Sequence, residues 1–347
     1  MSEHTRLSRE VILIDHTSGE LKAEHFAIVE TTARTPGPGE VLVRNRWFRV
    51  SISTRLMAEQ GAEEVKGIPF PPLNPGDTLA DGALGEVVQV GPGCDLAVGS
   101  LVMHPLGWRE YAVVPAAQCK RVGTADVDPA AWLGHGWTAF AALRECAQVR
   151  PGDTVLVTSG AGAIGSMAGQ IARLLGAGRV IGTTSGQQKA QWMREALGYD
   201  VVVTRDGGDF RTQLAVAAPD GIDVIVDMVG GEQLAAAIEQ TRHGARCVLL
   251  GALTAELNPR NATLKALVEV DTFQLILKGV TVRGFSADEH APTLFDAWLQ
   301  QAQAWQREGR IQLAHTLVKG LDNAPLALQE ACAGRLKGLV MVELAAL

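Results

Sequence analysis

The chain has 347 residues, more than one ordinary hydrophobic core contains, so we expect two domains of roughly 100 to 200 residues each. Hydrophobic residues make up 47% and charged residues 20% of the chain, which is typical of folded proteins and argues against extensive disorder. The formal net charge of -7 leaves no basic surface for the phosphates of nucleic acid, so we expect no nucleic-acid partner.

The N-terminal stretch carries scattered charges and no apolar run of signal-peptide length, and no membrane-spanning run follows it. We therefore expect a cytoplasmic protein with no membrane partner. The five cysteines are far apart and form no CxxC pair, which favours reduced core thiols. They are Cys94, Cys119, Cys146, Cys247 and Cys332. A nucleophilic role for Cys146 or Cys247 is the minor alternative.

Up to about residue 120, short β-like runs are separated by turns rich in proline and glycine. These runs are 11–14, 41–50, 86–90 and 111–115. Short runs bounded by turn residues predict an antiparallel, barrel-like domain.

From Pro151 onwards, apolar runs alternate with stretches that suit helices, such as 167–175 and 187–197, each followed by a glycine that can end a helix. The apolar runs are 154–157, 179–183, 200–204, 222–227 and 246–250. This alternation predicts a doubly wound parallel sheet. After about residue 310 the β-like pattern returns near His315 and at 338–344, and we expect this segment to rejoin the first domain.

The segment SGAGAIG at 159–165 contains GxGxxG, formed by Gly160, Gly162 and Gly165, directly after a predicted strand and before a predicted helix. Such glycines permit a tight turn and close approach to a pyrophosphate, while the helix N-terminus supplies free N–H donors. The surrounding βα pattern is the context that the motif requires, so it predicts a dinucleotide site. The alternative is a glycine turn needed only for packing.

An acid normally closes the second strand of an NAD site, about 20 residues after the glycine turn, to bind the ribose hydroxyl. Here the segment 183–189 reads TTSGQQK and contains no acid, and Arg205 follows the third strand. Lys189 and Arg205 can attract a 2′-phosphate, so the sequence favours NADPH over NADH. The alternative is that both are solvated surface charges.

Several motifs in this order resemble the medium-chain dehydrogenase/reductase superfamily, and within it the zinc-independent prostaglandin reductase and curcumin reductase-like enzymes. They are PGPGEVLVRN (36–45), GWREYAVV (107–114), LGHGWTAF (133–140), VTSGAGAIGSMAGQIARLLG (157–176), DMVGGE (227–232) and the pair Gly251 and Ala252. The resemblance covers nearly the whole chain. It implies an α/β fold in which a doubly wound parallel Rossmann sheet is inserted into a GroES-like, mostly antiparallel β-barrel domain. The implied division is a catalytic domain at 1–127, an NADP-binding domain at 128–313 and a returning segment at 314–347.

The resemblance also implies which residues bind the cofactor. Thr138 matches the residue beside the nicotinamide, and Met228 and Val229 match those over it. The remaining matches are Gly162, Ala163 and Ile164 at the pyrophosphate, Thr184, Ser185, Gly186, Lys189 and Arg205 at the adenosine phosphate, and Gly251, Ala252 and Phe285 near the nicotinamide.

No metal site is expected. Zinc-binding members of the superfamily carry GHE where this chain reads ADG at 80–82, and the chain has no four-cysteine cluster. An unfamiliar metal site formed by His104, His135 and a carboxylate is the alternative; lone histidines are more often core or cleft residues.

The resemblance implies metal-free, NADPH-dependent reduction of the carbon–carbon double bond of an α,β-unsaturated carbonyl compound, a small-molecule substrate, and a homodimer that pairs through the strand-like segment 280–285. A quinone reductase and a redox-silent descendant of the same fold stay open as alternatives. The substrate itself is not identified by the sequence.

The proton donor is the weakest part of the resemblance. Relatives place one tyrosine shortly after the Gly-Ala pair and another in the first domain, but this chain reads LTAELN after Ala252 and VSISTR at 50–55. We therefore expect Ser53, Arg55 and His135 to lie nearest the reacting carbon. His135 is the first choice, since an ordinary imidazole titrates near neutrality.

Overall fold

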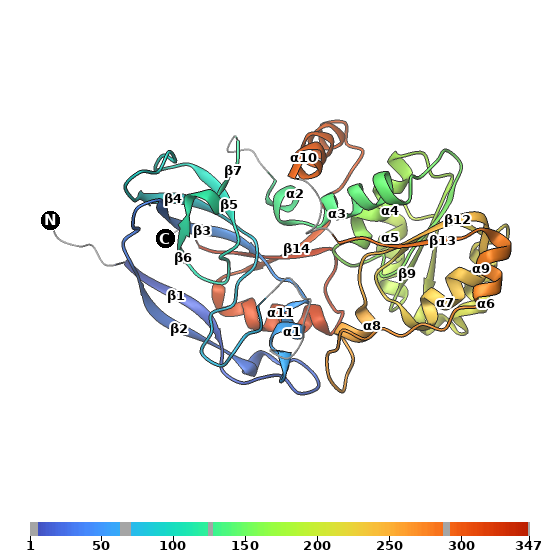
Figure 1. Ribbon diagram of the computed structural model, residues 1–347, viewed down its shortest axis with the longest axis horizontal. Helices are drawn as coiled ribbons and strands as arrows, with labels where there is room; N and C mark the ends of the chain where they lie inside the picture. The colour runs from blue at the N-terminus through green and yellow to red at the C-terminus, as the bar shows by residue number, and fades with distance from the viewer. Residues whose placement is uncertain (1–5, 63–70, 124–127, 287–291, 346–347) are drawn as a thin grey trace.

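The computed structural model describes residues 6–62, 71–123, 128–286 and 292–345, arranged as a β-rich lobe and a nucleotide-binding lobe (Figure 1). The C-terminal segment with β14 and α11 runs between them (Figure 1). The predicted boundary at residue 127 lies outside the described residues, so the division at 127 and 313 stays a proposal.

A six-stranded parallel sheet forms the nucleotide-binding lobe, which confirms the predicted doubly wound sheet. Its order is β10-β9-β8-β11-β12-β13, so the direction of winding reverses between β8 and β11. Ligands of such sheets bind at the carboxyl ends of the strands, at this switch point. The strands are β8 (Thr154–Val157), β9 (Arg179–Thr184), β10 (Val201–Thr204), β11 (Ile222–Asp227), β12 (Thr241–Leu249) and β13 (Thr281–Gly284).

Helices connect these strands. The predicted helix at 187–197 has those bounds, and it ends at Gly198, whose φ of 69° is the left-handed conformation that glycine adopts without strain. The connecting helices are α4 (Gly165–Leu174), α5 (Gln187–Leu197), α6 (Phe210–Ala217), α7 (Gly231–Glu239), α8 (Leu253–Glu256) and α9 (Thr272–Lys278).

The β-rich lobe contains a seven-stranded, mostly antiparallel sheet in the order β14-β15-β3-β4-β5-β7, with β6 paired to β3. β15 pairs with β3, so the C-terminal segment does rejoin the first lobe. The strands are β3 (Glu40–Arg49), β4 (Ala83–Val90), β5 (Leu101–His104), β6 (Tyr111–Pro115), β7 (Lys120–Arg121), β14 (His315–Lys319) and β15 (Leu339–Glu343). A separate hairpin is formed by β1 (Arg6–Leu13) and β2 (Phe26–Ala33).

Other helices lie between the lobes or on their surfaces. They are α1 (Thr54–Met57), α2 (Pro129–Leu133), α3 (Gly136–Ala141), α10 (Pro292–Arg307) and α11 (Ala324–Cys332). Shorter turns are η1 (Ala23–His25), η3 (Ala116–Gln118), η4 (Ala142–Cys146), η5 (Arg205–Gly207) and η7 (Leu321–Asn323). Among the described residues, no helix is long and apolar enough to cross a membrane.

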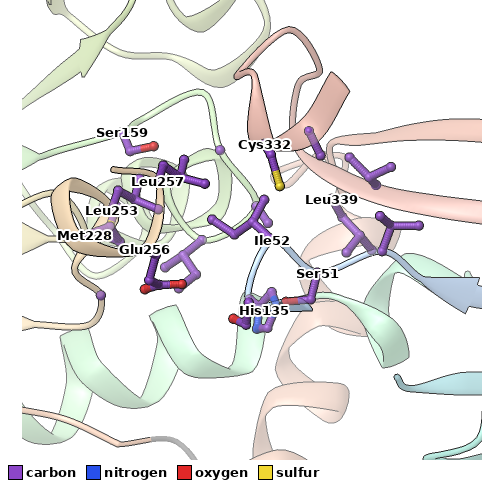
Figure 2. Close-up of a pocket in the computed structure, with 18 of the residues that line it drawn as sticks. Ser51, Ile52, His135, Ser159, Met228, Leu253, Glu256, Leu257, Cys332 and Leu339 are labelled. Carbon is purple, nitrogen blue, oxygen red and sulfur yellow. Dashed lines mark hydrogen bonds between the residues drawn. The ribbon is translucent and has the colours of Figure 1, made fainter. Parts of the chain in front are cut away.

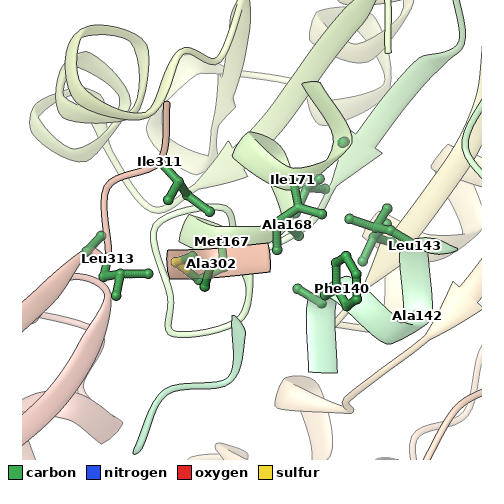
Figure 3. Packing of buried hydrophobic residues seen from close by; sticks show 14 of the residues in the cluster. Phe140, Ala142, Leu143, Met167, Ala168, Ile171, Ala302, Ile311 and Leu313 are labelled. Atoms are coloured by element: carbon green, nitrogen blue, oxygen red, sulfur yellow. The ribbon is translucent and has the colours of Figure 1, made fainter. Parts of the chain in front are cut away.

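The largest apolar core joins α3, α4 and α10, where Phe140, Met167, Ile171 and Ala302 are buried together (Figure 3). α3 and α10 approach closely because Gly136 has no side chain: a Cβ there would lie 2.2 Å from the Trp298 ring. This packing fixes α3, which carries Thr138, against the nucleotide-binding lobe.

Candidate active site

A cleft of about 1860 Å³ runs along the carboxyl ends of the parallel strands and continues into the β-rich lobe. Its nucleotide side includes the turn after β8, the end of β9 and the turn after β11. Its other side is formed by residues 49–54, the loop before α3 and the end of α11. The topological switch point and the cleft therefore coincide, as expected for a dinucleotide site.

The three glycines of the turn after β8 have different roles. A Cβ on Gly165 would lie 2.2 Å from the Ser159 carbonyl oxygen, so backbone would have to move, whereas one on Gly160 would lie 2.3 Å from the end of the Met193 side chain, which would have to move instead. Gly162 lines the cleft, and a Cβ there would have the Ser159 hydroxyl as its nearest neighbour, at 3.1 Å. Packing thus explains two of the glycines, and Gly162 leaves room for close backbone approach by a ligand.

Asp227 holds the turn after β11 in place. Its carboxylate accepts hydrogen bonds from the Thr158 hydroxyl at 2.7 Å and from the Gly230 N–H at 2.8 Å. The same hydroxyl accepts from the Met228 N–H at 2.8 Å. Burial raises the pKa of Asp227, while these hydrogen bonds lower it. Met228 and Val229 line the cleft as predicted, and their backbone is positioned by this buried network.

Thr138 also lines the cleft, and its hydroxyl is buried with no hydrogen-bond partner among the described residues. A buried unpaired hydroxyl is unfavourable by about 1–3 kcal/mol, so such a group is normally satisfied by a bound molecule. The unpaired hydroxyl of Thr138 and the backbone at Gly162 fit a phosphorylated dinucleotide. The cations Lys189 and Arg205 fit its phosphate.

Two cations line the cleft beside Ser185, namely Lys189 and Arg205. Arg205 is exposed, but the Lys189 ammonium group donates to the carbonyl oxygens of Gly334 at 2.6 Å and Leu336 at 2.7 Å. Burial and then the charge of Lys337 lower the pKa of Lys189. Lys189 is therefore no solvated surface charge, since it ties the nucleotide-binding lobe to the C-terminal segment.

Most other predicted cofactor residues also line the cleft. Ala163, Ile164, Thr184, Gly251 and Phe285 do so. Gly186 and Ala252 are next to lining residues without lining the cleft themselves. The cofactor assignments remain proposals, supported in most cases by this placement.

At the substrate end, the structure brings Ser53 and His135 to the cleft but not Arg55. The Arg55 side chain is buried, and it donates from Nη2 to the carbonyl oxygens of Gly19, at 2.6 Å, and Asn258. The expectation that Arg55 lies near the reacting carbon is therefore corrected: it links three segments of backbone.

His135 projects into the cleft near Ser51 (Figure 2). Burial, and then the positive charge of Arg49, lower the pKa of His135 to about 3. The expectation of an imidazole that titrates near neutrality is wrong, because the cationic form loses its hydration and meets a like charge. A neutral His135 can still donate a hydrogen bond from its N–H.

Glu256, at the end of α8, was not among the expected site residues, yet it lines the cleft facing His135 (Figure 2). It is the fourth residue after Ala252 in LTAELN, a segment that stands out in the sequence only for its missing tyrosine. An acidic residue in this position is the signal that could have identified it. Cys332 of α11 also lines the cleft, and burial raises its pKa to about 12.

Within the described part of the chain, the histidines and cysteines show no grouping suited to a metal. Both ring nitrogens of His104 are used, one with the Asn45 side-chain oxygen at 2.8 Å and the other as acceptor from the Leu106 N–H. Asp81 of the ADG segment forms an ion pair with Arg49. Among the described residues, no three His, Cys, Asp or Glu side chains are grouped so as to hold a metal ion.

Cys146 and Cys247 do not fit a nucleophile either. Burial raises the pKa of both thiols, that of Cys247 to about 12, so the thiolate form is disfavoured. All five cysteines are free.

Two family models match the chain: "N-terminal domain of oxidoreductase" at residues 9–122 and "Zinc-binding dehydrogenase" at residues 163–301. The NADPH-dependent curcumin reductase of Escherichia coli is 27% identical and matches 99% of each chain. The chain belongs to the medium-chain dehydrogenase/reductase superfamily.

Two further members extend the comparison. Prostaglandin reductase 1 of Bos taurus is 29% identical over 86% of this chain and 87% of its own. The crystal structure of CurA in complex with NADPH from Vibrio vulnificus is 27% identical, with a TM-score of 0.87 over 98% of this chain and 100% of that one. The superfamily fold predicted from the motifs is thereby confirmed.

Proposed function

We propose that this superfamily member catalyses the NADPH-dependent reduction of the carbon–carbon double bond of an α,β-unsaturated carbonyl compound. The observation that carries the proposal is the likeness, along the whole chain, to the NADPH-dependent curcumin reductase and to the NADPH complex of CurA. The cleft supports it, because the Thr138 hydroxyl, the Gly162 turn and Lys189 all line it and are groups suited to a phosphorylated dinucleotide.

NADPH bound in this cleft supplies a hydride to the β-carbon of the substrate. The chain's own residues bind NADPH and the substrate and orient them for the reaction. The Gly162 N–H donates to the Ser159 carbonyl oxygen at 2.9 Å, so the backbone N–H groups between Gly162 and the start of α4 are the ones offered to the pyrophosphate, and Thr138 offers its hydroxyl beside the ring. Ile52, Leu253 and Leu257 line the cleft with apolar side chains that exclude water from the reacting double bond (Figure 2).

The proposal includes a preference for NADPH over NADH. Ser185, Lys189 and Arg205 line the same cleft, and β9 itself ends on Thr184 without an acid. The Asp206 carboxylate lies against Gly186, where a Cβ would be 3.1 Å from it, and the two cations offset its charge. The Lys189 ammonium group uses two of its three N–H donors on the Gly334 and Leu336 carbonyl oxygens, and we propose that the third binds a 2′-phosphate.

A substrate screen tests the proposed reaction. Purified protein with NADPH should convert members of a panel of enones, enals and enoyl thioesters to products heavier by two hydrogens, as measured by mass spectrometry alongside NADPH consumption. Quinones belong in the same panel. Turnover of quinones alone would establish the quinone-reductase alternative, and no turnover despite NADPH binding would establish the redox-silent one.

We also propose that the reaction needs no metal, since the family-model name "Zinc-binding dehydrogenase" is not matched by a ligand set at Asp81 or His104. Elemental analysis of protein purified without chelators should show no stoichiometric zinc. Activity that a chelator removes and zinc restores would contradict this.

We propose a cytoplasmic homodimer. β13 is the last strand of its sheet, and apolar side chains on it and on α9 are exposed, among them Phe273 at 64% and Ile276 at 73%. A sheet edge next to exposed apolar side chains is suited to pairing with a second copy. Light scattering at micromolar concentration should give the dimer mass, and a monomer mass would refute the proposal.

A further inference from the structure

The helix that carries Glu256 is fixed to the turn predicted to cover the nicotinamide. Leu253 donates its N–H to the Met228 carbonyl oxygen at 3.0 Å. Thr254 donates to the Val229 carbonyl oxygen twice, from its N–H at 3.1 Å and from its hydroxyl at 2.8 Å. The backbone of α8, which carries Glu256 at its end, is therefore held in a set position relative to this turn.

The surroundings of Glu256 are mostly apolar. Met228, Leu253 and Leu257 lie on its side of the cleft, and His135 and Ser51 face it from the other side (Figure 2). Burial raises the pKa of Glu256, an effect that a hydrogen bond from the Ala252 backbone opposes. No cationic side chain among the described residues forms an ion pair with it, so the neutral carboxyl form is favoured.

Neighbouring groups keep a fixed charge. His135 is neutral above about pH 3, and the Cys332 thiol is neutral below about pH 12. The Arg55 guanidinium is bound to carbonyl oxygens, and Arg49 is paired with Asp81. Among these described neighbours, Glu256 is thus the carboxyl group that has no ion pair and whose pKa burial raises.

Reduction of an enone creates negative charge on the substrate as the hydride arrives at the β-carbon. An ionised carboxylate in the cleft would oppose this charge, whereas a neutral carboxyl group can stabilise it and give up a proton. We propose that Glu256 is the proton donor of the reaction, a role that rests on the proposed enone reduction.

Protonation by Glu256 completes the addition of two hydrogens to the double bond. NADPH would supply the hydride and be oxidised to NADP⁺, and the double-bond electron pair moves to the α-carbon and carbonyl oxygen as the new β-carbon–hydrogen bond forms. The Glu256 O–H bond then breaks, its proton forms the bond to the α-carbon, and its electron pair stays on the carboxylate. Solvent returns a proton to Glu256 when the product leaves.

Glu256→Gln tests the role with little change in shape. We expect kcat to fall by about 10² to 10⁴, the usual contribution of a general acid, while NADPH affinity stays within about twofold. The wild-type rate should decrease as pH rises through the raised pKa of Glu256, because the donor loses its proton, and the variant should lack this alkaline limb. Glu269→Gln, an exposed site outside the cleft, is the matched control and should match wild type.

A second variant and an infrared spectrum distinguish loss of the proton donor from misfolding. Glu256→Tyr supplies a different O–H donor, with an ordinary pKa of about 10, and should move the alkaline limb upward. Difference infrared spectra of wild-type protein should show a protonated-carboxyl C=O band that disappears as pH rises, and Glu256→Gln should lack it. This measurement needs no substrate.

The two proposals fail differently. Wild-type protein that reduces no enone would overturn the proposed function and this role with it. Wild-type turnover that Glu256→Gln leaves within about threefold, with the alkaline limb intact, would overturn the role of Glu256 alone. The role of Glu256 would also be overturned if the alkaline limb of the rate profile were the same in Glu256→Tyr as in wild type, or if wild-type protein lacked the protonated-carboxyl band.

Discussion

The two ends of the cleft are built in different ways. The end proposed to bind the phosphates presents mainly backbone, with Gly160 and Gly165 packed against neighbours and Gly162 lining the cleft. At the substrate end, side chains come from separate parts of the chain, including Ser53, His135 and Glu256. A backbone site depends on a contiguous motif, whereas a side-chain site depends on how distant segments meet.

The ends also differ in how their polar groups are satisfied. Asp227 and Thr158 satisfy each other and the adjoining backbone, so the turn beside the nicotinamide site is complete without a ligand. Among the described residues, the Thr138 hydroxyl has no hydrogen-bond partner, and Glu256 has a hydrogen bond from the Ala252 backbone but no ion pair. Groups that are buried without local compensation are the ones expected to act on bound molecules.

The largest effect is expected from Gly162→Val, which tests whether the phosphate end binds NADPH through backbone that no side chain covers. A branched side chain at this position would block the approach of the pyrophosphate, so NADPH affinity should fall at least about 100-fold, or about 2.7 kcal/mol. Fluorescence titration measures the affinity, and the loss of unfolding free energy should be smaller than that of Gly165→Ala, because a Cβ at 162 would lie 3.1 Å from the Ser159 hydroxyl whereas one at 165 would lie 2.2 Å from a backbone oxygen.

Gly165→Ala is the matched control, because its Cβ would collide with the Ser159 carbonyl oxygen rather than with a ligand. We expect a lower free energy of unfolding, by about 1–3 kcal/mol, as for other overpacked sites. If Gly162→Val lost stability instead and kept its affinity, the distinction between the packing glycines and the open one would be wrong.

The sequence predicts the phosphate end well for a physical reason. A strand, a glycine turn and a helix in succession leave little conformational choice, so β8, Gly162 and α5 lie as predicted. Lys189 was predicted at the cleft, but its bonds to the Gly334 and Leu336 carbonyl oxygens join residues 145 or more positions apart, which no local pattern reveals.

The substrate end was predicted less well. Arg55 is in a promising segment, but its guanidinium turns to backbone at Gly19 and Asn258, a choice set by tertiary packing. The low pKa of His135 likewise depends on burial and on Arg49, which is far away in sequence. Glu256 was overlooked because its carboxyl group gains meaning only from the apolar neighbours that surround it in the fold.

A smaller effect is expected from Lys189→Ala, which tests whether the phosphate end also uses a side-chain charge. NADPH affinity should fall about tenfold, or about 1.4 kcal/mol, with NADH affinity nearly unchanged. Titration of both cofactors by protein fluorescence measures the preference. Lys265→Ala, an exposed lysine outside the cleft, is the control, and equal affinities of the wild-type protein for NADPH and NADH would contradict the predicted preference.

The smallest effect on turnover is expected from His135→Ala, which tests whether the His135 imidazole donates the proton to the substrate. Because the folded pKa of His135 is about 3, the side chain is neutral on both sides of pH 6.5 and adds no limb to the rate profile between pH 5 and 8. Loss of a neutral N–H donor should lower kcat about tenfold or less. A larger loss, together with a limb near pH 6 to 7 in wild type only, would restore His135 as the proton donor.

The lowered pKa of His135 also predicts the direction in which the free energy of unfolding changes with pH. Below pH 6.5 the unfolded chain gains a proton at His135 that the folded protein does not accept, so the free energy of unfolding falls as pH decreases from about 6.5 towards about 3. Above pH 6.5 both states are neutral there and no dependence remains. Urea unfolding from pH 7 to 4 should show a shallower decrease in His135→Ala than in wild type. Parallel curves would mean that the cleft hydrates the imidazole, and the substrate end would then hold two groups able to titrate instead of Glu256 alone.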